Sequence, residues 1–276
     1  MRFFLAIFAL IPLFATGQGV ASISGKPAKI NYYVNLYAQA DGSAGDTRNV
    51  LSFIDKLEQK KTSFKQTGDF LEYLFRKGHL RFLKTYAEYA SFGETINKGR
   101  YNCLTGTAFY ALLLDHFEIP YEIIETNYHI FLLAHSENGP VLFETTDPAN
   151  GLVRNAAEID KRVRGYKQNE IQTASSDKAY YKYNVDLYNQ VNLDQLLGLL
   201  HYNLSIVAYN EQNLPLSIHH LSKAMESYQS PRFDEFSRII LLSVMEAKLE
   251  PSEKAKCLET VRSLRKKHLV VTASKN

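Results

Sequence analysis

This chain of 276 residues has a small net charge, few cysteines and few long apolar runs. The formal net charge is only +3, and no basic stripe interleaved with aromatic residues is present, so neither an acidic partner nor a nucleic acid is indicated. The eight histidines show no paired spacing of metal ligands, so no metal site is expected. No cofactor is expected either. With 45% hydrophobic and 22% charged residues, the composition is that of a globular protein with a sizeable core.

The apolar run at the N-terminus is too short to span a bilayer comfortably. Met1 and Arg2 precede an uncharged apolar run over residues 3–14, and small residues follow at 15–17. This pattern is typical of a cleaved signal peptide, here residues 1–17. No cysteine lies at the expected cleavage site, so a lipid anchor is not indicated. We therefore expect an exported protein, periplasmic or secreted, with no stable membrane anchor.

The only two cysteines, Cys103 and Cys257, have different surroundings. Cys257 belongs to an apolar stripe at helical spacing within residues 251–264, which predicts a buried structural thiol. Cys103 follows Asn102, a good N-cap residue, and opens an apolar helix expected over residues 103–117. The unpaired N–H groups and the dipole at a helix start stabilise a thiolate, so Cys103 is a candidate nucleophile. Pairing of the two thiols in an oxidising compartment is the alternative.

Three strand-like runs follow the Cys103 helix, over residues 121–126, 129–135 and 141–145. His129 heads the second run, and Glu144 and Asp147 lie at the end of the third. An imidazole can take the proton of a thiol, and a carboxylate can hold the imidazole in the right orientation, so this order predicts nucleophilic catalysis. Glu144 is the preferred acid because it lies on the expected strand, and Asp147 is its rival. A satisfied core histidine and a small buried cysteine are the structural alternatives.

Helical patterns flank this segment on both sides. Apolar residues recur at helical spacing over residues 50–60 and 67–89, where Gly78 is a candidate break. Beyond a polar stretch that ends near Ala179 the pattern is helical again, and residues 202–224 resemble one tetratricopeptide repeat. We predict an α+β fold, in which the Cys103 helix packs on a small antiparallel sheet, followed by an all-α module. The expected domains are residues 18–165 and residues 180–270.

Residues 99–151 resemble the transglutaminase-like superfamily, particularly its bacterial branches with a helical-repeat region behind the core. The matching elements are Asn102-Cys103 at a helix start, residues 128–132 at a strand start, and residues 143–148 at the end of the next strand. The resemblance implies a papain/transglutaminase-like core. It also implies Cys103 as nucleophile and His129 as base.

The resemblance leaves the acid open between two carboxylates. In the family an aspartate is commonly followed two positions on by a threonine, and by that spacing Glu144 with Thr146 takes the place. Asp147 with Pro148 matches a variant of some branches. The animal enzymes usually carry a tryptophan after the cysteine, where this chain has Leu104 and contains no tryptophan at all, so their transamidation chemistry and calcium activation are not implied.

Two functions of different classes follow from these patterns. The first is a cysteine-dependent amide hydrolase or acyltransferase with a peptide or protein substrate. The second is a non-catalytic scaffold whose helical module holds a protein partner.

Overall fold

The computed structural model describes residues 25–168 and 187–273. The expected signal peptide and residues 180–186 of the expected helical module lie outside the described residues. The helices are α1 (Lys26–Gln39), α2 (Thr47–Lys61), α3 (Thr67–Phe82), α4 (Phe92–Lys98), α5 (Cys103–His116), α6 (Ala156–Lys167), α7 (Leu193–Asn210), α8 (Leu214–Ser227), α9 (Pro231–Glu246) and α10 (Pro251–Ala273). The strands are β1 (Thr85–Tyr86), β2 (Arg100–Tyr101), β3 (Tyr121–Thr126), β4 (Ile130–Ser136), β5 (Gly139–Phe143), β6 (Leu152–Val153) and β7 (Tyr188–Val191).

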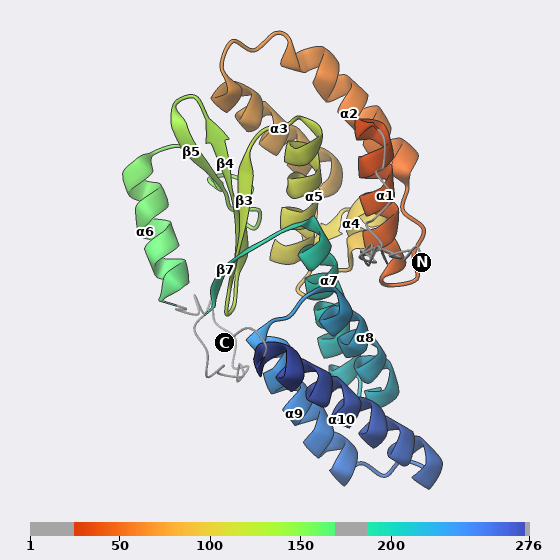
Figure 1. Ribbon diagram of the computed structural model, residues 1–276. Helices are drawn as coiled ribbons and strands as arrows, with labels where there is room; N and C mark the ends of the chain where they lie inside the picture. Colours follow the sequence, from red (N-terminus) through yellow and green to blue (C-terminus); the bar gives the residue numbers. More distant parts are fainter. Residues whose placement is uncertain (1–24, 169–186, 274–276) are drawn as a thin grey trace, which may run out of the picture.

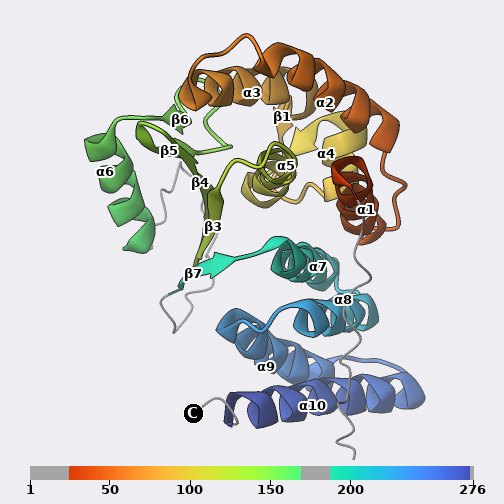
Figure 2. The ribbon, with the colours of Figure 1, turned by 45° about the horizontal axis from the view of Figure 1, so that its top comes forward.

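A five-stranded antiparallel sheet lies between helices, in the strand order β6-β5-β4-β3-β7. Helix α5 covers one face and α6 the other, with α3 and α2 beyond α5 (Figures 1 and 2). Helices α7 to α10 then stack one behind another away from the sheet (Figure 2). The predicted mixed α+β fold followed by an all-helical region is therefore confirmed.

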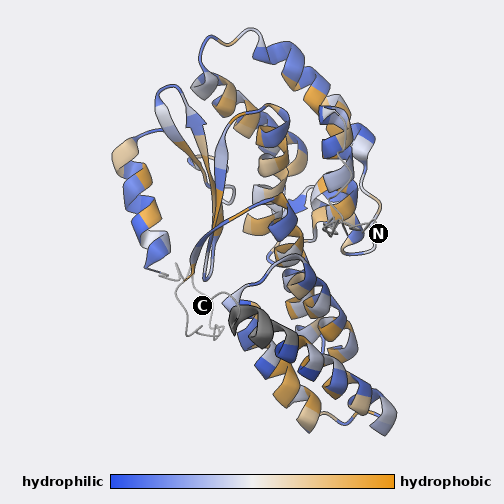
Figure 3. Ribbon diagram, viewed as in Figure 1, coloured by the Kyte–Doolittle hydropathy of each residue, from blue (hydrophilic) through white to orange (hydrophobic). Residues whose placement is uncertain are grey.

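Helix α5 is the centre of the core because its sequence is apolar or small on every side. Twelve of its residues are buried, and they are Leu104, Thr105, Gly106, Thr107, Ala108, Phe109, Tyr110, Ala111, Leu112, Leu113, Leu114 and His116. A helix that is apolar all round is stable only when other elements enclose it. Figure 3 shows the same contrast, with α5 largely hydrophobic and α2 and α6 striped. Cys103 is the first residue of α5, so the packing of this buried helix fixes its position.

The helical pattern expected over residues 67–89 ends earlier in the structure, and Gly78 does not break it. Helix α3 stops at Phe82, and Tyr86 belongs to β1, which pairs with β2. A Cβ at Gly78 would lie 2.6 Å from the Tyr110 hydroxyl, so this glycine allows α3 to approach α5 closely. The expectation of a helix to residue 89 is wrong, because apolar spacing alone does not show where the backbone leaves the helix.

The polar stretch after residue 151 contains a helix that the sequence pattern did not predict. Helix α6 begins after Asn155, whose side chain accepts a hydrogen bond from Glu158 N, and it packs on the outer face of the sheet. A small second core forms there from Ile124, Phe131, Leu142, Val153 and Ile159. Both faces of the central strands are therefore covered, as the continuous apolar run of β4 predicts.

The C-terminal helical region is joined to the sheet by β7. Residues 188–191, expected within the helical module, pair with β3 instead, and Asn192 then caps α7. Helices α7 and α8 meet where Ser205 and Ser217 each donate a hydrogen bond to the other's carbonyl group. Cys257 is buried in α10, and both cysteines are free. Within the described ranges, every helix is too short or too polar to cross a bilayer.

We expect Gly106→Ala to lower the free energy of unfolding by about 1–3 kcal/mol, because a Cβ there would lie 2.9 Å from both Leu83 Cδ2 and Thr145 Oγ1. Urea unfolding followed by circular dichroism measures the change. Gly165→Ala in α6 is the matched control: a Cβ there meets no atom within 4 Å, so the better helix propensity should raise stability by up to about 1 kcal/mol. Equal effects at the two glycines would contradict the close approach at Gly106.

Candidate active site

Cys103 lies at the first position of α5, behind a fully formed cap. The Asn102 side chain accepts a hydrogen bond from Thr105 N at 3.0 Å, and the Thr105 hydroxyl accepts one from Asn102 N at 3.1 Å. The Asn102 amide also donates to the carbonyl groups of Glu88 and Ala90 at 2.9 and 3.1 Å. The prediction that Asn102 caps this helix is confirmed. These hydrogen bonds fix the position of the backbone that carries the Cys103 thiol.

The first turn of α5 presents free N–H donors beside the thiol. Thr105 N donates to the Asn102 side chain, and Gly106 N donates to the Asn102 carbonyl at 3.0 Å. The N–H groups of Cys103 and Leu104 have no hydrogen-bond partner among the residues that the structure describes. Unpaired donors at a helix N-terminus stabilise negative charge nearby, whether it is on a thiolate or on the oxygen of a tetrahedral intermediate.

The segment after β5 is attached directly to the start of α5. The Thr145 hydroxyl donates to the Cys103 carbonyl at 3.4 Å, and His79 Nε2 donates to the Thr145 carbonyl at 3.0 Å. Because Thr145 is fully buried between these contacts, the neighbouring Glu144 is held at a fixed distance from the helix.

His129 closes the tight turn between β3 and β4. Thr126 N donates to the His129 carbonyl at 2.8 Å, and His129 N donates to the Thr126 hydroxyl at 3.1 Å. Strand β4 itself begins one residue later, at Ile130. The imidazole therefore projects from a turn that is hydrogen-bonded at both ends, with Nε2 lying 2.5 Å from Glu144 Oε2.

Glu144 follows β5 directly and is a buried carboxylate with four hydrogen bonds. Oε2 accepts from His129 Nε2 and from the Tyr166 hydroxyl, the latter at 2.8 Å. Oε1 accepts from Thr146 N at 3.1 Å and from the Thr146 hydroxyl at 2.5 Å. Four donors can offset the cost of burying a charge that is only 7% exposed. This carboxylate is therefore built to stay ionised against the imidazole.

Asp147 lies near this cluster but is used differently. Its Oδ1 accepts a hydrogen bond from Asn150 N at 2.9 Å, and its Oδ2 lies 3.7 Å from Arg162 Nη1. Its carbonyl accepts from Gly151 N at 2.7 Å. Asp147 thus stabilises the loop between β5 and β6, and Glu144 is the carboxylate that the structure brings to His129. The reason given for preferring Glu144 needs correction, since β5 ends at Phe143.

The hydrogen bonds of the cluster shift the pKa values of His129 and Glu144 in the directions that favour the charged form of each. Burial lowers the pKa of His129, but hydrogen bonds with Cys103 and Glu144 outweigh it and raise this pKa well above its ordinary value. Burial raises the pKa of Glu144, but hydrogen bonds from His129, Thr146 and Tyr166 outweigh it and lower the pKa to about 2. With Nε2 engaged by Glu144, Nδ1 is the ring nitrogen left for Cys103. A proton is therefore retained on the imidazole, between the sulfur and the carboxylate.

Tyr166 is a member of the cluster that the sequence reasoning missed. It lies on α6, its hydroxyl donates to Glu144, and its ring centroid is 4.8 Å from that of His129. Burial and the neighbouring Glu144 raise the pKa of Tyr166, so the hydroxyl stays a donor. Ile159, Val163 and Tyr166 recur at helical spacing in an otherwise polar stretch. This spacing could have predicted a helix whose apolar face includes Tyr166.

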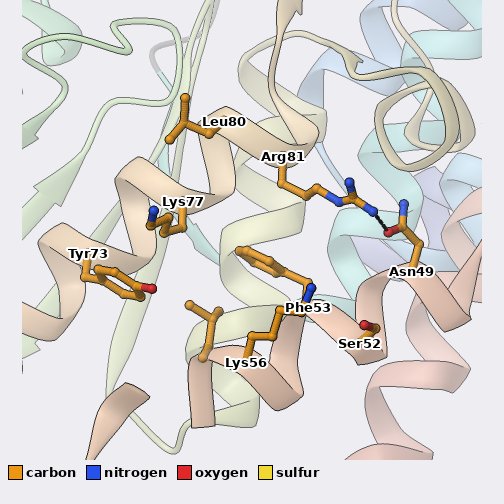
Figure 4. Close-up of a pocket in the computed structure, with 9 residues that line it drawn as sticks. Asn49, Ser52, Phe53, Lys56, Tyr73, Lys77, Leu80 and Arg81 are labelled. Atoms are coloured by element: carbon orange, nitrogen blue, oxygen red, sulfur yellow. Dashed lines mark hydrogen bonds between the residues drawn. The ribbon is translucent and has the colours of Figure 1, made fainter. Parts of the chain in front are cut away.

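Away from this cluster, a cavity of about 370 Å³ lies between α2 and α3 (Figure 4). Its lining includes the cations Lys56, Lys77 and Arg81 and the apolar Phe53 and Leu80. Neither Cys103 nor the carboxylate cluster contributes to it. In the described ranges, no group of three or more His, Cys, Asp or Glu side chains is placed to hold a metal ion.

Comparison with protein-family models, with curated proteins and with solved structures finds no match for this chain.

Because Glu144 is ionised in the folded protein, we predict that the free energy of unfolding falls in acid. Its pKa is lowered to about 2, whereas the value in an unfolded chain is about 4.3, so its contribution is complete above about pH 4.3 and disappears as the pH falls through 2. Between pH 5 and pH 2 the wild type should lose about 2 kcal/mol more unfolding free energy than Glu144→Gln does. Urea unfolding at a series of pH values measures the difference.

Asp147→Asn is the matched comparison, because Asp147 does not contact the imidazole. It should keep the acid-dependent loss of the wild type. If Asp147→Asn removes the loss and Glu144→Gln keeps it, the carboxylates have been assigned the wrong way round.

Proposed function

We propose that this protein is a thiol enzyme that acts on amide or peptide bonds, with Cys103 as nucleophile, His129 as general acid and base, and Glu144 as the acid that orients the ring. One observation carries the proposal: Glu144 Oε2 lies 2.5 Å from Nε2 of the His129 ring, and Cys103 lies near enough to the same ring to raise its pKa. The three groups come from a helix start, a turn and the end of a strand, so local sequence does not force them together.

The first half-reaction forms an acyl-enzyme. The Cys103 thiolate attacks the carbonyl carbon of the amide, and the new C–S bond places negative charge on the carbonyl oxygen. The N–H groups of Cys103 and Leu104 are available to stabilise that oxyanion. As the tetrahedral intermediate collapses, the C–N bond breaks and the His129 imidazolium gives its proton to the leaving amine.

The second half-reaction releases the acyl group. Neutral His129 takes a proton from water or from an amine as that nucleophile attacks the thioester carbon. The C–S bond then breaks, sulfur leaves as thiolate, and the imidazolium is restored. Water gives hydrolysis and an amine gives acyl transfer. Glu144 stays ionised throughout and stabilises the charge on the ring.

The proposed class is the transglutaminase-like superfamily, with a papain/transglutaminase-like core. The order of a helix headed by Cys103, a strand preceded by His129 and an acid after the next strand supports it, as does the packing of α5 on an antiparallel sheet. Glu144 with Thr146 fits the acid position of this class, because Thr146 donates twice to the carboxylate.

The competing function is a scaffold in which the helical module holds a protein partner and the thiol is idle. One observation favours it: Leu242 and Met245 of α9 are 60% and 53% exposed. Apolar side chains in this position can contact another protein. The scaffold function requires no special reactivity of Cys103, so a measurement of that reactivity separates the two functions.

We expect Cys103 to react with iodoacetamide about tenfold faster than a model thiol at pH 6.5, because a proton retained on His129 stabilises the thiolate. Peptide mass spectrometry after timed quenching gives the rate for each cysteine separately. The buried Cys257 serves as an internal comparison and should react much more slowly. His129→Gln should reduce the Cys103 rate by about tenfold.

Asp147→Asn is the control variant and should leave the Cys103 rate close to that of the wild type. Reaction of Cys103 at the ordinary rate, unchanged in His129→Gln, would overturn the enzyme function and leave the scaffold.

A further inference from the structure

The turn that carries His129 is held from outside by the helical region. Arg232, at the start of α9, donates from Nη2 to the carbonyl groups of Thr126 and Asn127, the latter at 3.2 Å. Thr126 is also the residue whose backbone and hydroxyl hydrogen-bond to the backbone of His129. A side chain more than a hundred residues away in sequence thus contacts the first half of the catalytic turn.

The guanidinium of Arg232 is fixed in place by a buried carboxylate. Arg232 Nε lies 3.1 Å from Oε1 of Glu125, a residue of β3 that is 1% exposed. Tyr228, from the end of α8, donates its hydroxyl to the other carboxylate oxygen of Glu125 at 2.7 Å. Burial raises the pKa of Glu125 above its ordinary value, and the opposing effects of Arg232 and Tyr228 offset this only in part. The ion pair therefore joins the helical region to the strand that leads into the turn.

An aromatic ring of α7 lies beside the same arginine. The guanidinium carbon lies 5.8 Å from the ring centroid of Tyr202 on α7, and Tyr202 stacks on Phe233 with a centroid distance of 4.8 Å. The side chain of Arg232 is only 13% exposed, so its position is set by α7, α8 and α9 together. Residues from three helices of the region converge on one contact with the sheet.

Stability alone does not account for an arginine here. A buried ion pair often contributes no more than well-packed apolar residues of the same volume would, because both charges must be desolvated. The Nη2 group of Arg232 donates to two backbone carbonyl groups of the turn that precedes β4. The planar fork of an arginine can reach two carbonyls and a carboxylate at once, which a lysine cannot do.

We propose that the C-terminal helical region is a positioning element of the active site and acts through Arg232 on the turn that carries His129. This inference rests on the proposed function and gives the helical region a role within it. Arg232 does not touch the thiol or the carboxylate of Glu144, so it is a positioning residue. Arg232 donates to backbone carbonyl groups of the turn, so its effect on His129 is through the position of that turn.

Two measurements on the full chain test the proposal. The first is the titration of the His129 ring by NMR with labelled histidine, assigned through His129→Gln. The second is the rate of Cys103 alkylation. In Arg232→Met the turn loses both carbonyl contacts, so the His129 pKa should fall toward its ordinary value of about 6.5, and the alkylation rate should fall about tenfold. Arg232→Lys keeps a positive charge beside Glu125 but loses the planar guanidinium. It should therefore lower the His129 pKa and the alkylation rate by less than Arg232→Met does.

Arg238→Met is the matched control, because Arg238 lies on the same helix, is 64% exposed and pairs only with Asp234 among the described residues. It should leave both measurements unchanged. Arg232→Met leaves a buried Glu125 unpaired, which can prevent folding. The double variant Glu125→Gln/Arg232→Met removes both charges, and a folded double variant with a wild-type His129 titration and alkylation rate would overturn the proposal.

The outcomes separate this inference from the proposed function. If wild-type His129 titrates at its ordinary value and His129→Gln does not change the alkylation rate, the proposed function fails, and the inference fails with it. If the wild type shows the raised pKa and fast alkylation, and a folded Arg232→Met shows both as well, only the inference fails.

Discussion

The buried carboxylate of Glu144 is the constraint on which the rest of the site depends. A charge at this depth is tolerated because four donors reach it: one from His129, one from Tyr166, and the N–H and hydroxyl groups of Thr146. Two of these donors also lie against each other, because the rings of His129 and Tyr166 have centroids 4.8 Å apart. Strand β5, helix α6 and the turn before β4 must therefore all be in place before the proton on the ring is held.

The thiol is brought to this cluster by the burial of α5. Because that helix is apolar on every side, its position in the core leaves little freedom, and the cap by Asn102 determines where it starts. Gly106 and Thr145 then bring the end of β5 against the first turn.

The parts of this arrangement that could be predicted from the sequence are those encoded by neighbouring residues. The cap at Asn102, the helix after it and the strands around His129 follow from local patterns, since capping and apolar spacing act over a few residues. The contributions of Tyr166 and Arg232 could not be predicted, because they depend on helices that pack on the sheet from far along the chain. Local spacing favours Glu144, through Thr146 two positions on, but it leaves Asp147 as a rival, because the backbone turn after β5 decides which carboxylate faces His129.

The most direct test of the account is a crystal structure of the protein with a reduced Cys103. The account predicts the sulfur within about 4 Å of His129 Nδ1, with Nε2 of the same ring on Glu144. An imidazole turned toward Asp147, or a sulfur directed into the core away from the ring, would contradict it.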